Sequence, residues 1–386
     1  MKIKIFITIL FITLLNSVIA QNYQFYIPDY VQFRVDSLLQ KKIYKALDKL
    51  FEDINSDIEE SKLVDKSNYN LNVEFFIDLK GLELSKKYNN PNFYKKQLIN
   101  AYEILPNQYL LEMAFIGYAN NYPIINRICS IIAYNKKGKI TFLSPLMYRT
   151  KNWEKKQIGN ILYYYKTDLN ISEAEKFNKL TINIAKNLEL EPLQLVFYKC
   201  DNFQEVFKII GFDYDLIYNG KSKESWILDN TIFQGFNNEQ FSHDIFHVYT
   251  SKMIDRKDRN WTAEEGIAYS WGDAYYPKSN GKIITRDELV YILKDYLNKK
   301  PNTNLLSLFE KRSSLFNELS PNVKVKSVLS SLICDEVQKE KGNEGIIELI
   351  KCGKGDDNFF KTTDELIQLN RLNFNEEVKK MIDKFE

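Results

Sequence analysis

Histidine is nearly absent from this chain: there are two among 386 residues, although tyrosine and phenylalanine number 25 each. An excess of one charge sign is absent as well, because the formal net charge is only +2. A balanced charge offers no surface for a polyanion, so nucleic acid is not an expected partner. No internal repeat or low-complexity linker interrupts the chain, and its 44% apolar residues suffice for real hydrophobic cores.

Long apolar runs are also missing, except at the start of the chain. Residues 1–4 form a short cationic start, residues 5–19 are mostly apolar, and Ala20 precedes the polar Gln21. This pattern predicts a secretory signal peptide over residues 1–20, and the run is short for a membrane span. We therefore expect a periplasmic or secreted protein without an integral membrane segment once the signal is removed.

The four cysteines, Cys129, Cys200, Cys334 and Cys352, could form disulfides in an oxidising compartment. The sequence predicts helices over 323–341 and 344–351, on either side of a tight turn at 342–343. If these helices are antiparallel, Cys334 and Cys352 lie at the same height, so a disulfide between them is suspected. The alternative is two buried thiols that behave as small apolar residues.

The overall expectation is an α+β fold with two domains. Residues 21–166 are predicted to form an N-terminal α+β domain. Its elements are a helix within 30–63, a strand over 71–78, a hairpin of strands 127–134 and 139–143, and a strand over 157–166.

Residues 167–386 are predicted to form a second domain with a small sheet and a mainly helical C-terminal part. Ser172 and Glu175 have the spacing of a capping box for a helix that runs to about 188. The other predicted elements are strands over 193–199 and 227–236, a helix over 204–210, a helix from about 238, and nearly continuous helix from 262.

The two histidines, His243 and His247, lie four residues apart in this second domain. On a helix this spacing places both imidazoles on one face, where they can bind a single ion. A structural zinc site would need four protein ligands, commonly with cysteine, and no cysteine is nearby in the sequence. A catalytic site needs only three protein ligands, so we expect a carboxylate from another helix as the third.

The segment that follows resembles a known family. Glu265-Gly266-Ile267-Ala268 matches the Glu-Gly-x-Ala of the gluzincin zinc peptidases, and seventeen residues separate Glu265 from His247. The chain is similar in particular to peptidase MA-like proteins, which are related to the catalytic domain of aminopeptidase N. The resemblance is specific over 243–272 and loose over the rest of 193–386. It implies one Zn²⁺ per chain, bound by His243, His247 and Glu265.

An alternative for Glu265 stays open. Thr262 and Glu265 have the spacing of a capping box, in which the glutamate would reach back to the helix start. In that case Glu264, which occupies the family's asparagine position, is the candidate third ligand. The register with Gly266 and Ala268 favours Glu265.

Two departures from the family bear on activity. Asp244 stands where the family has the glutamate that takes a proton from the attacking water. Aspartate is shorter by one carbon–carbon bond, about 1.5 Å, and a misplacement of about 1 Å can cost about a hundredfold in rate. The family's later oxyanion-stabilising tyrosine has no counterpart, since no tyrosine follows Tyr296. Tyr291 or Tyr296 are the candidates to replace it.

The sequence therefore predicts an exported zinc metallopeptidase that hydrolyses peptide bonds of a peptide or protein substrate. Asp244 is its expected catalytic carboxylate, and the shorter side chain is expected to attenuate the activity. The alternative is a catalytically inactive member of the same fold that binds peptides or envelope partners.

Overall fold

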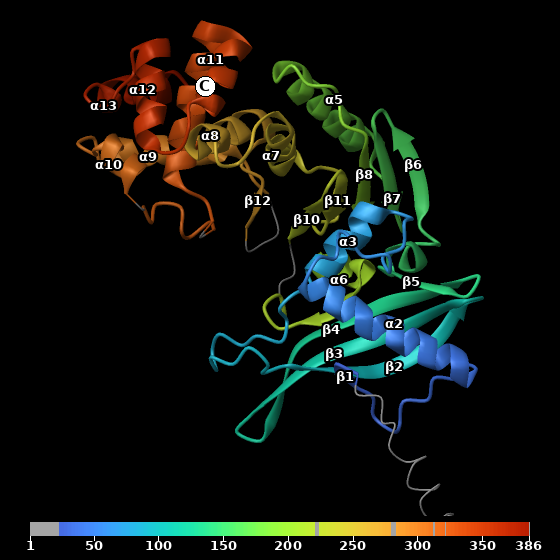
Figure 1. Ribbon diagram of the computed structural model, residues 1–386. Helices are drawn as coiled ribbons and strands as arrows, with labels where there is room; N and C mark the ends of the chain where they lie inside the picture. The colour runs from blue at the N-terminus through green and yellow to red at the C-terminus, as the bar shows by residue number, and fades with distance from the viewer. Residues whose placement is uncertain (1–22, 221–223, 279–282, 312, 321, 386) are drawn as a thin grey trace, which may run out of the picture. The chain divides into compact units, whose positions relative to one another are not determined.

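A computed structural model describes residues 23–220, 224–278, 283–311, 313–320 and 322–385. The predicted signal peptide lies outside these residues. The chain divides into two compact units, one made of 1–152 and 203–222, the other of 153–202 and 223–386. Both units combine helices with β-sheet (Figure 1), so the α+β fold class is confirmed.

The first unit is built on a sheet whose strands follow the order β1-β2-β3-β4-β5, with β9 paired to β4. The strands are β1 (Phe25–Tyr26), β2 (Lys95–Leu105), β3 (Gln108–Ala119), β4 (Tyr122–Lys136), β5 (Lys139–Leu143) and β9 (Phe212–Asp215). The predicted hairpin over 127–143 is confirmed as β4–β5. Its turn residues Lys137 and Gly138 both have positive φ, which matches the twist of the flanking strands.

Helix α2 (Ser37–Asn55) covers this sheet in Figure 1. It begins at Asp36, whose carboxylate accepts hydrogen bonds from the amides of Leu38 and Leu39. Its buried face includes Phe51, whose ring meets that of Phe115 on β3 edge-on. The predicted helix within 30–63 is therefore present, although it is shorter at both ends.

The predicted strand over 71–78 is wrong, because this segment is helix α3 (Tyr69–Ile77). Its apolar residues alternate as in a strand, but Asn72, Val73, Phe75 and Phe76 are all buried, a spacing that fits one helical face. The amide side chain of Asn72 is bonded to the backbone at 65, 67 and 144. These tertiary contacts override the local alternation. Short helices α4 (Leu146–Arg149) and α6 (Phe203–Ile210) complete the unit.

The second unit contains a five-stranded sheet in the order β10-β11-β8-β7-β6. The predicted strands over 157–166 and 227–236 are each a hairpin instead: β6 (Glu154–Ile158) with β7 (Ile161–Tyr165), and β10 (Ser225–Leu228) with β11 (Thr231–Gln234). Gly159 and Asp229 turn the chain at positive φ, a turn signal that the apolar runs obscured. Strand β8 is Leu195–Lys199.

The units divide differently from the expected boundary at 166/167. Residues 153–166 lie in the second unit, since β7 pairs in parallel with β8. Residues 203–222 return to the first unit, since β9 pairs with β4. Pairing between strands distant in sequence decides both assignments.

Helices make up the rest of the second unit: α5 (Ile171–Asn187), α7 (Ser242–Met253), α8 (Trp261–Gly272), α9 (Arg286–Lys299), α10 (Leu305–Glu310), α11 (Val325–Lys351), α12 (Asp356–Ile367) and α13 (Phe374–Lys384). A short ribbon of β12 (Tyr276–Pro277) and β13 (Ile283–Ile284) follows α8. The predicted capping box of α5 is wrong, because Asn170 caps this helix through the amide of Glu173.

Two glycines allow the helices around the histidines to approach closely. A Cβ at Gly272, the last residue of α8, would lie 2.1 Å from the carbonyl oxygen of Ser242 on α7. A Cβ at Gly266 would lie 2.7–2.9 Å from atoms of Ser330 on α11. Gly266 of the family-like motif therefore has a packing role, since only hydrogen fits between α8 and α11.

Cys334 and Cys352 are free thiols in the structure, so the suspected bridge between them is absent. The chain does turn sharply at Gly342 within α11, where φ is positive. The thiols nevertheless have different surroundings: Cys334 faces the carbonyl of Ala263, and Cys352 faces that of Gly353. Two cysteines at matching positions in a helical hairpin do not form a disulfide when their side chains point in different directions.

Among the helices of the described residues, none is long and apolar enough for a membrane crossing.

Candidate metal centre

Helix α7 carries both histidines on the side that faces α8. Its other buried residues, Ile245, Phe246 and Tyr249, belong to the core of the unit. His243 is buried and His247 is partly buried. The helical spacing of four places their rings on the same face, with the centroids 5.2 Å apart.

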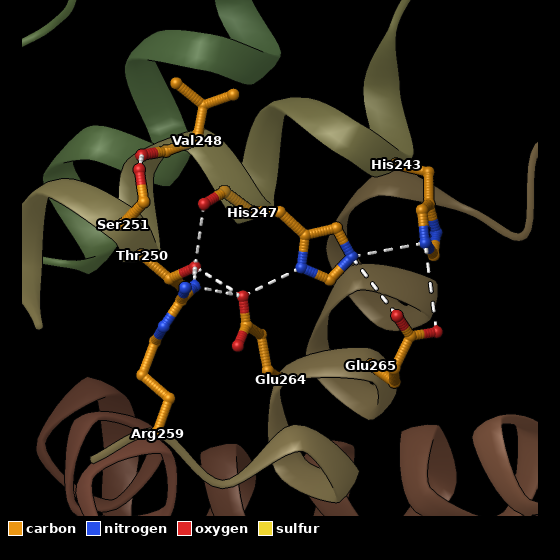
Figure 2. Close-up of polar contacts among 8 residues, drawn as sticks. All are labelled: His243, His247, Val248, Thr250, Ser251, Arg259, Glu264 and Glu265. Atoms are coloured by element: carbon orange, nitrogen blue, oxygen red, sulfur yellow. Dashed lines mark hydrogen bonds and ion pairs between the residues drawn. The ribbon is translucent and has the colours of Figure 1, made fainter. Parts of the chain in front are cut away.

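Helix α8 brings two glutamates to these rings, one to each side of His247 (Figure 2). The helix is capped by Asn260, whose side chain accepts from the amide of Ala263. The hydroxyl of Thr262 donates instead to Asp356 on α12. The capping box that was considered for Thr262 and Glu265 is therefore not formed, and Glu265 faces the histidines.

His243, His247 and Glu265 form one cluster whose candidate ligand atoms all lie within 4.8 Å of one another. The two Nε2 atoms are 3.4 Å apart. The Glu265 carboxylate oxygens lie 3.3 Å from Nε2 of His247 and 4.0 Å from Nε2 of His243. Ligand atoms about 2.0–2.1 Å from a tetrahedral zinc ion are about 3.3–3.4 Å apart. Two of the three separations match this spacing, and the third, from His243 to the other oxygen of Glu265, is wider.

The outer nitrogen of each imidazole is bonded to an acceptor that fixes the ring. Nδ1 of His243 is 3.0 Å from the carbonyl oxygen of Asp273. Nδ1 of His247 is 2.8 Å from Oε1 of Glu264. Carbonyl and carboxylate oxygens only accept, so each Nδ1 carries the proton and each Nε2 is directed into the cluster.

Glu264 therefore supports His247 from behind, and it does not belong to the three-residue cluster. It is 1% exposed and also accepts hydrogen bonds from Thr250 and Arg259. Burial alone would raise its pKa, but hydrogen bonds from His247 and Thr250 and the nearby positive charges lower it. Of the two glutamates weighed from the sequence, Glu265 is the one placed beside both Nε2 atoms.

The electrostatics of the cluster favour a positive charge in the absence of a metal ion. Burial alone would lower the pKa of His247, but hydrogen bonds to Glu264 and Glu265 raise it to about 9. The pKa of Glu265 is lowered: burial opposes this shift, while the hydrogen bond from His247 and the charges of the two histidines outweigh it. Two carboxylates thus face one pair of imidazoles.

A cavity of about 770 Å³ opens beside His247 and Asp244. Strand β10, an edge of the sheet within the described residues, lines it with Ser225, Trp226 and Ile227. Its volume lies in the range of ligand pockets. Asp244 is exposed at this cavity, on the turn of α7 between the two histidines.

Tyr276 on β12 also lines the cavity, and it was missed in the sequence. Its ring centroid is 6.0 Å from that of His243. Burial and then the charges of Glu265 and Asp244 raise its pKa. Tyr291, considered as the replacement tyrosine, is 50% exposed and packs on Phe385.

Tyr276 could not be identified from the sequence, because its position depends on a turn after α8. Helix α8 ends at Gly272, and Asp273 and Tyr275 both adopt positive φ, which is rare outside glycine. The Asp273 carboxylate accepts from the amides of Ala274 and Arg286 and holds this turn. The carbonyl oxygen of Asp273 also contacts Nδ1 of His243, so this one turn positions both the candidate ligand His243 and Tyr276.

No family model matches the chain, and no curated protein matches its sequence. The interpretation of the site therefore depends on its geometry and on the motif resemblance.

Proposed function

We propose that this protein is a zinc-dependent, gluzincin-like metallopeptidase and that His243, His247 and Glu265 bind one Zn²⁺ ion. The observation that carries the proposal is the convergence of the chain's only two histidines with Glu265 at distances suited to one tetrahedral ion. Three imidazole and carboxylate ligands that leave a fourth position for water are typical of catalytic zinc sites. Of the three residues proposed here, His247 lines the cavity. Export through residues 1–20 is part of the same proposal.

Zinc bound there would supply a coordinated water with a pKa of about 7 and would polarise the scissile carbonyl. Asp244, exposed at the cavity beside the cluster, is the group placed to accept a proton from the attacking water. Tyr276, which lines the same cavity with its ring 6.0 Å from that of His243, would donate to the carbonyl oxygen as negative charge develops on it. Glu264 and Asp273 hold the two imidazoles in the required orientation.

An extended peptide is the substrate class that fits the cavity best. Backbone N–H and C=O groups of an edge strand can pair with such a peptide, and β10 lies along the cavity wall. Aromatic side chains, among them Trp226 and Phe236, would contact its side chains.

The experiment that tests this function measures zinc content and peptide cleavage on the same purified protein. We expect about one zinc ion per chain by mass spectrometry, its loss in a His243→Ala/His247→Ala variant, and cleavage of members of a broad peptide library. Bound zinc without cleavage would refute the peptidase activity but not the metal centre. Absence of zinc after loading would refute both.

A second candidate function is a catalytically inactive peptide-binding protein, and it is favoured by one residue. Asp244 is shorter than the glutamate of the family by about 1.5 Å, and a misplaced base of this kind costs about a hundredfold in rate. Asp244→Glu discriminates between the two. A gain of peptidase activity from an inactive starting protein would identify an otherwise complete site.

A further inference from the structure

A buried charge cluster lies behind the metal centre, on the side of His247 that faces away from Glu265 (Figure 2). Three donors converge on a single oxygen, Oε1 of Glu264. Arg259 Nη1 lies at 2.6 Å, Thr250 Oγ1 at 2.7 Å and His247 Nδ1 at 2.8 Å. Arg259 Nη1 also donates to the hydroxyl of Thr250 at 2.9 Å, which closes the cluster.

These groups are buried to a degree that makes an unpaired charge costly. Glu264 is 1% exposed, Thr250 is fully buried and Arg259 is 8% exposed. Removing one partner of a buried ion pair is strongly destabilising, because the remaining charge is neither hydrated nor neutralised. Arg259 therefore supplies the positive charge that allows the Glu264 carboxylate to be buried beside Nδ1 of His247.

The carboxylate is itself a departure from the resemblance, since Glu264 occupies the position of the family's asparagine. A neutral amide can accept from an imidazole Nδ1–H without any compensating cation. A carboxylate at the same place accepts more strongly but brings a negative charge into the interior. Arg259, in the loop between α7 and α8, supplies the opposite charge.

We propose that Arg259 and Glu264 act as one positioning unit that holds His247 in the metal-binding tautomer, so that metal affinity depends on Arg259, which is not itself a ligand. This inference rests on the proposed zinc centre. Arg259 reaches the imidazole of His247 through Glu264, because its guanidinium bonds Oε1 of Glu264. It also bonds the hydroxyl of Thr250, which contacts the backbone carbonyl of His247 and not its ring. It is a positioning residue rather than a catalytic one.

The test is a double-mutant cycle read as zinc affinity above pH 9, where competition from a proton on His247 is nearly absent. The affinity is measured by competition with a chelator on the full mature chain. Arg259→Met leaves the Glu264 carboxylate without its cation, and Glu264→Gln leaves Arg259 without its anion. Each single variant should weaken zinc binding about 10–100-fold, the range for lost outer-shell partners. The double variant removes both charges and keeps an amide acceptor for His247, so its affinity should return to within about threefold of the wild type.

Lys257→Met is the matched control, because Lys257 lies two residues earlier in the same loop and its exposed side chain pairs with the exposed Asp255. Its zinc affinity should equal that of the wild type. Thermal unfolding of each metal-free variant separates lost affinity from lost folding. If Arg259→Met fails to fold, the comparison of Glu264→Gln with the double variant still decides the matter, since we expect tighter binding by the double variant.

Three outcomes are informative. Rescue in the double variant supports the positioning unit. Zinc binding that is unchanged in Arg259→Met, or losses in the double variant that equal the product of the two single losses, overturns it and leaves the zinc centre intact. Absence of zinc binding by the wild type overturns the centre and this inference together.

Discussion

Zinc binding should release a proton from His247, and the amount released should depend on pH. The carboxylates of Glu264 and Glu265 raise the pKa of His247 to about 9 in the metal-free protein. A metal ligand must be unprotonated, and at pH 7 only about one His247 in a hundred is neutral if its pKa is about 9. Displacing that proton costs about 2.7 kcal/mol at pH 7 and almost nothing above pH 9.

We therefore expect the apparent zinc affinity to rise about tenfold for each pH unit between pH 7 and pH 9 and then to level off. Calorimetry in two buffers of different ionisation enthalpy should report about one proton released per zinc ion at pH 7. Asp244→Asn is the control, because Asp244 is not among the groups that shift the pKa of His247. An affinity that stays flat across this window would refute the argument.

The same shift predicts how stability changes with pH in the metal-free protein. The pKa of His247 is 6.5 in the unfolded chain and about 9 in the folded one. Because the folded value is the higher, the stabilisation is fully present below pH 6.5 and is lost as pH rises through 9. The shift corresponds to about 3 kcal/mol, so the unfolding temperature without metal should fall over this window. Bound zinc should abolish that fall.

Three further predictions concern single residues. Tyr276→Phe should lower kcat about 10²-fold or more with zinc content unchanged, while Tyr291→Phe should retain full activity; equal activities would refute the role of Tyr276. Gly266→Ala should destabilise the protein by about 1–3 kcal/mol in denaturant unfolding, since the added methyl group meets Ser330 at 2.7 Å; unchanged stability would contradict this packing. Burial raises the pKa of Asp78 from 3.8 to about 6, so its ionisation lowers stability as pH rises from about 4 through 6. Asp78→Asn should remove that decline, which amounts to about 2–3 kcal/mol, and a decline that persists would contradict it.

Local sequence patterns predicted the elements whose conformation depends on residues close together in the chain. The hairpin of β4 and β5 follows from a two-residue turn between β-rich runs, and α2 follows from an apolar stripe at helical spacing. The spacing of His243 and His247 also needs only a helix to become a pair of neighbouring imidazoles. The pattern of Glu265 to Ala268 indicated which helix carries the carboxylate of the three-residue cluster.

The tertiary structure decided the features that depend on partners distant in sequence. Residues 69–77 form a helix because buried contacts outweigh their strand-like alternation. Asn260 caps α8, and Asp356 accepts a hydrogen bond from Thr262 in its first turn. The side chain of Glu265 is therefore directed to the histidines, and that of Glu264 contacts Arg259. The place of Tyr276 depends on a turn at positive φ that no propensity predicts. Sequence spacing determines which side chains share a face of one helix, but the roles of two adjacent glutamates depend on what packs against each side of that helix.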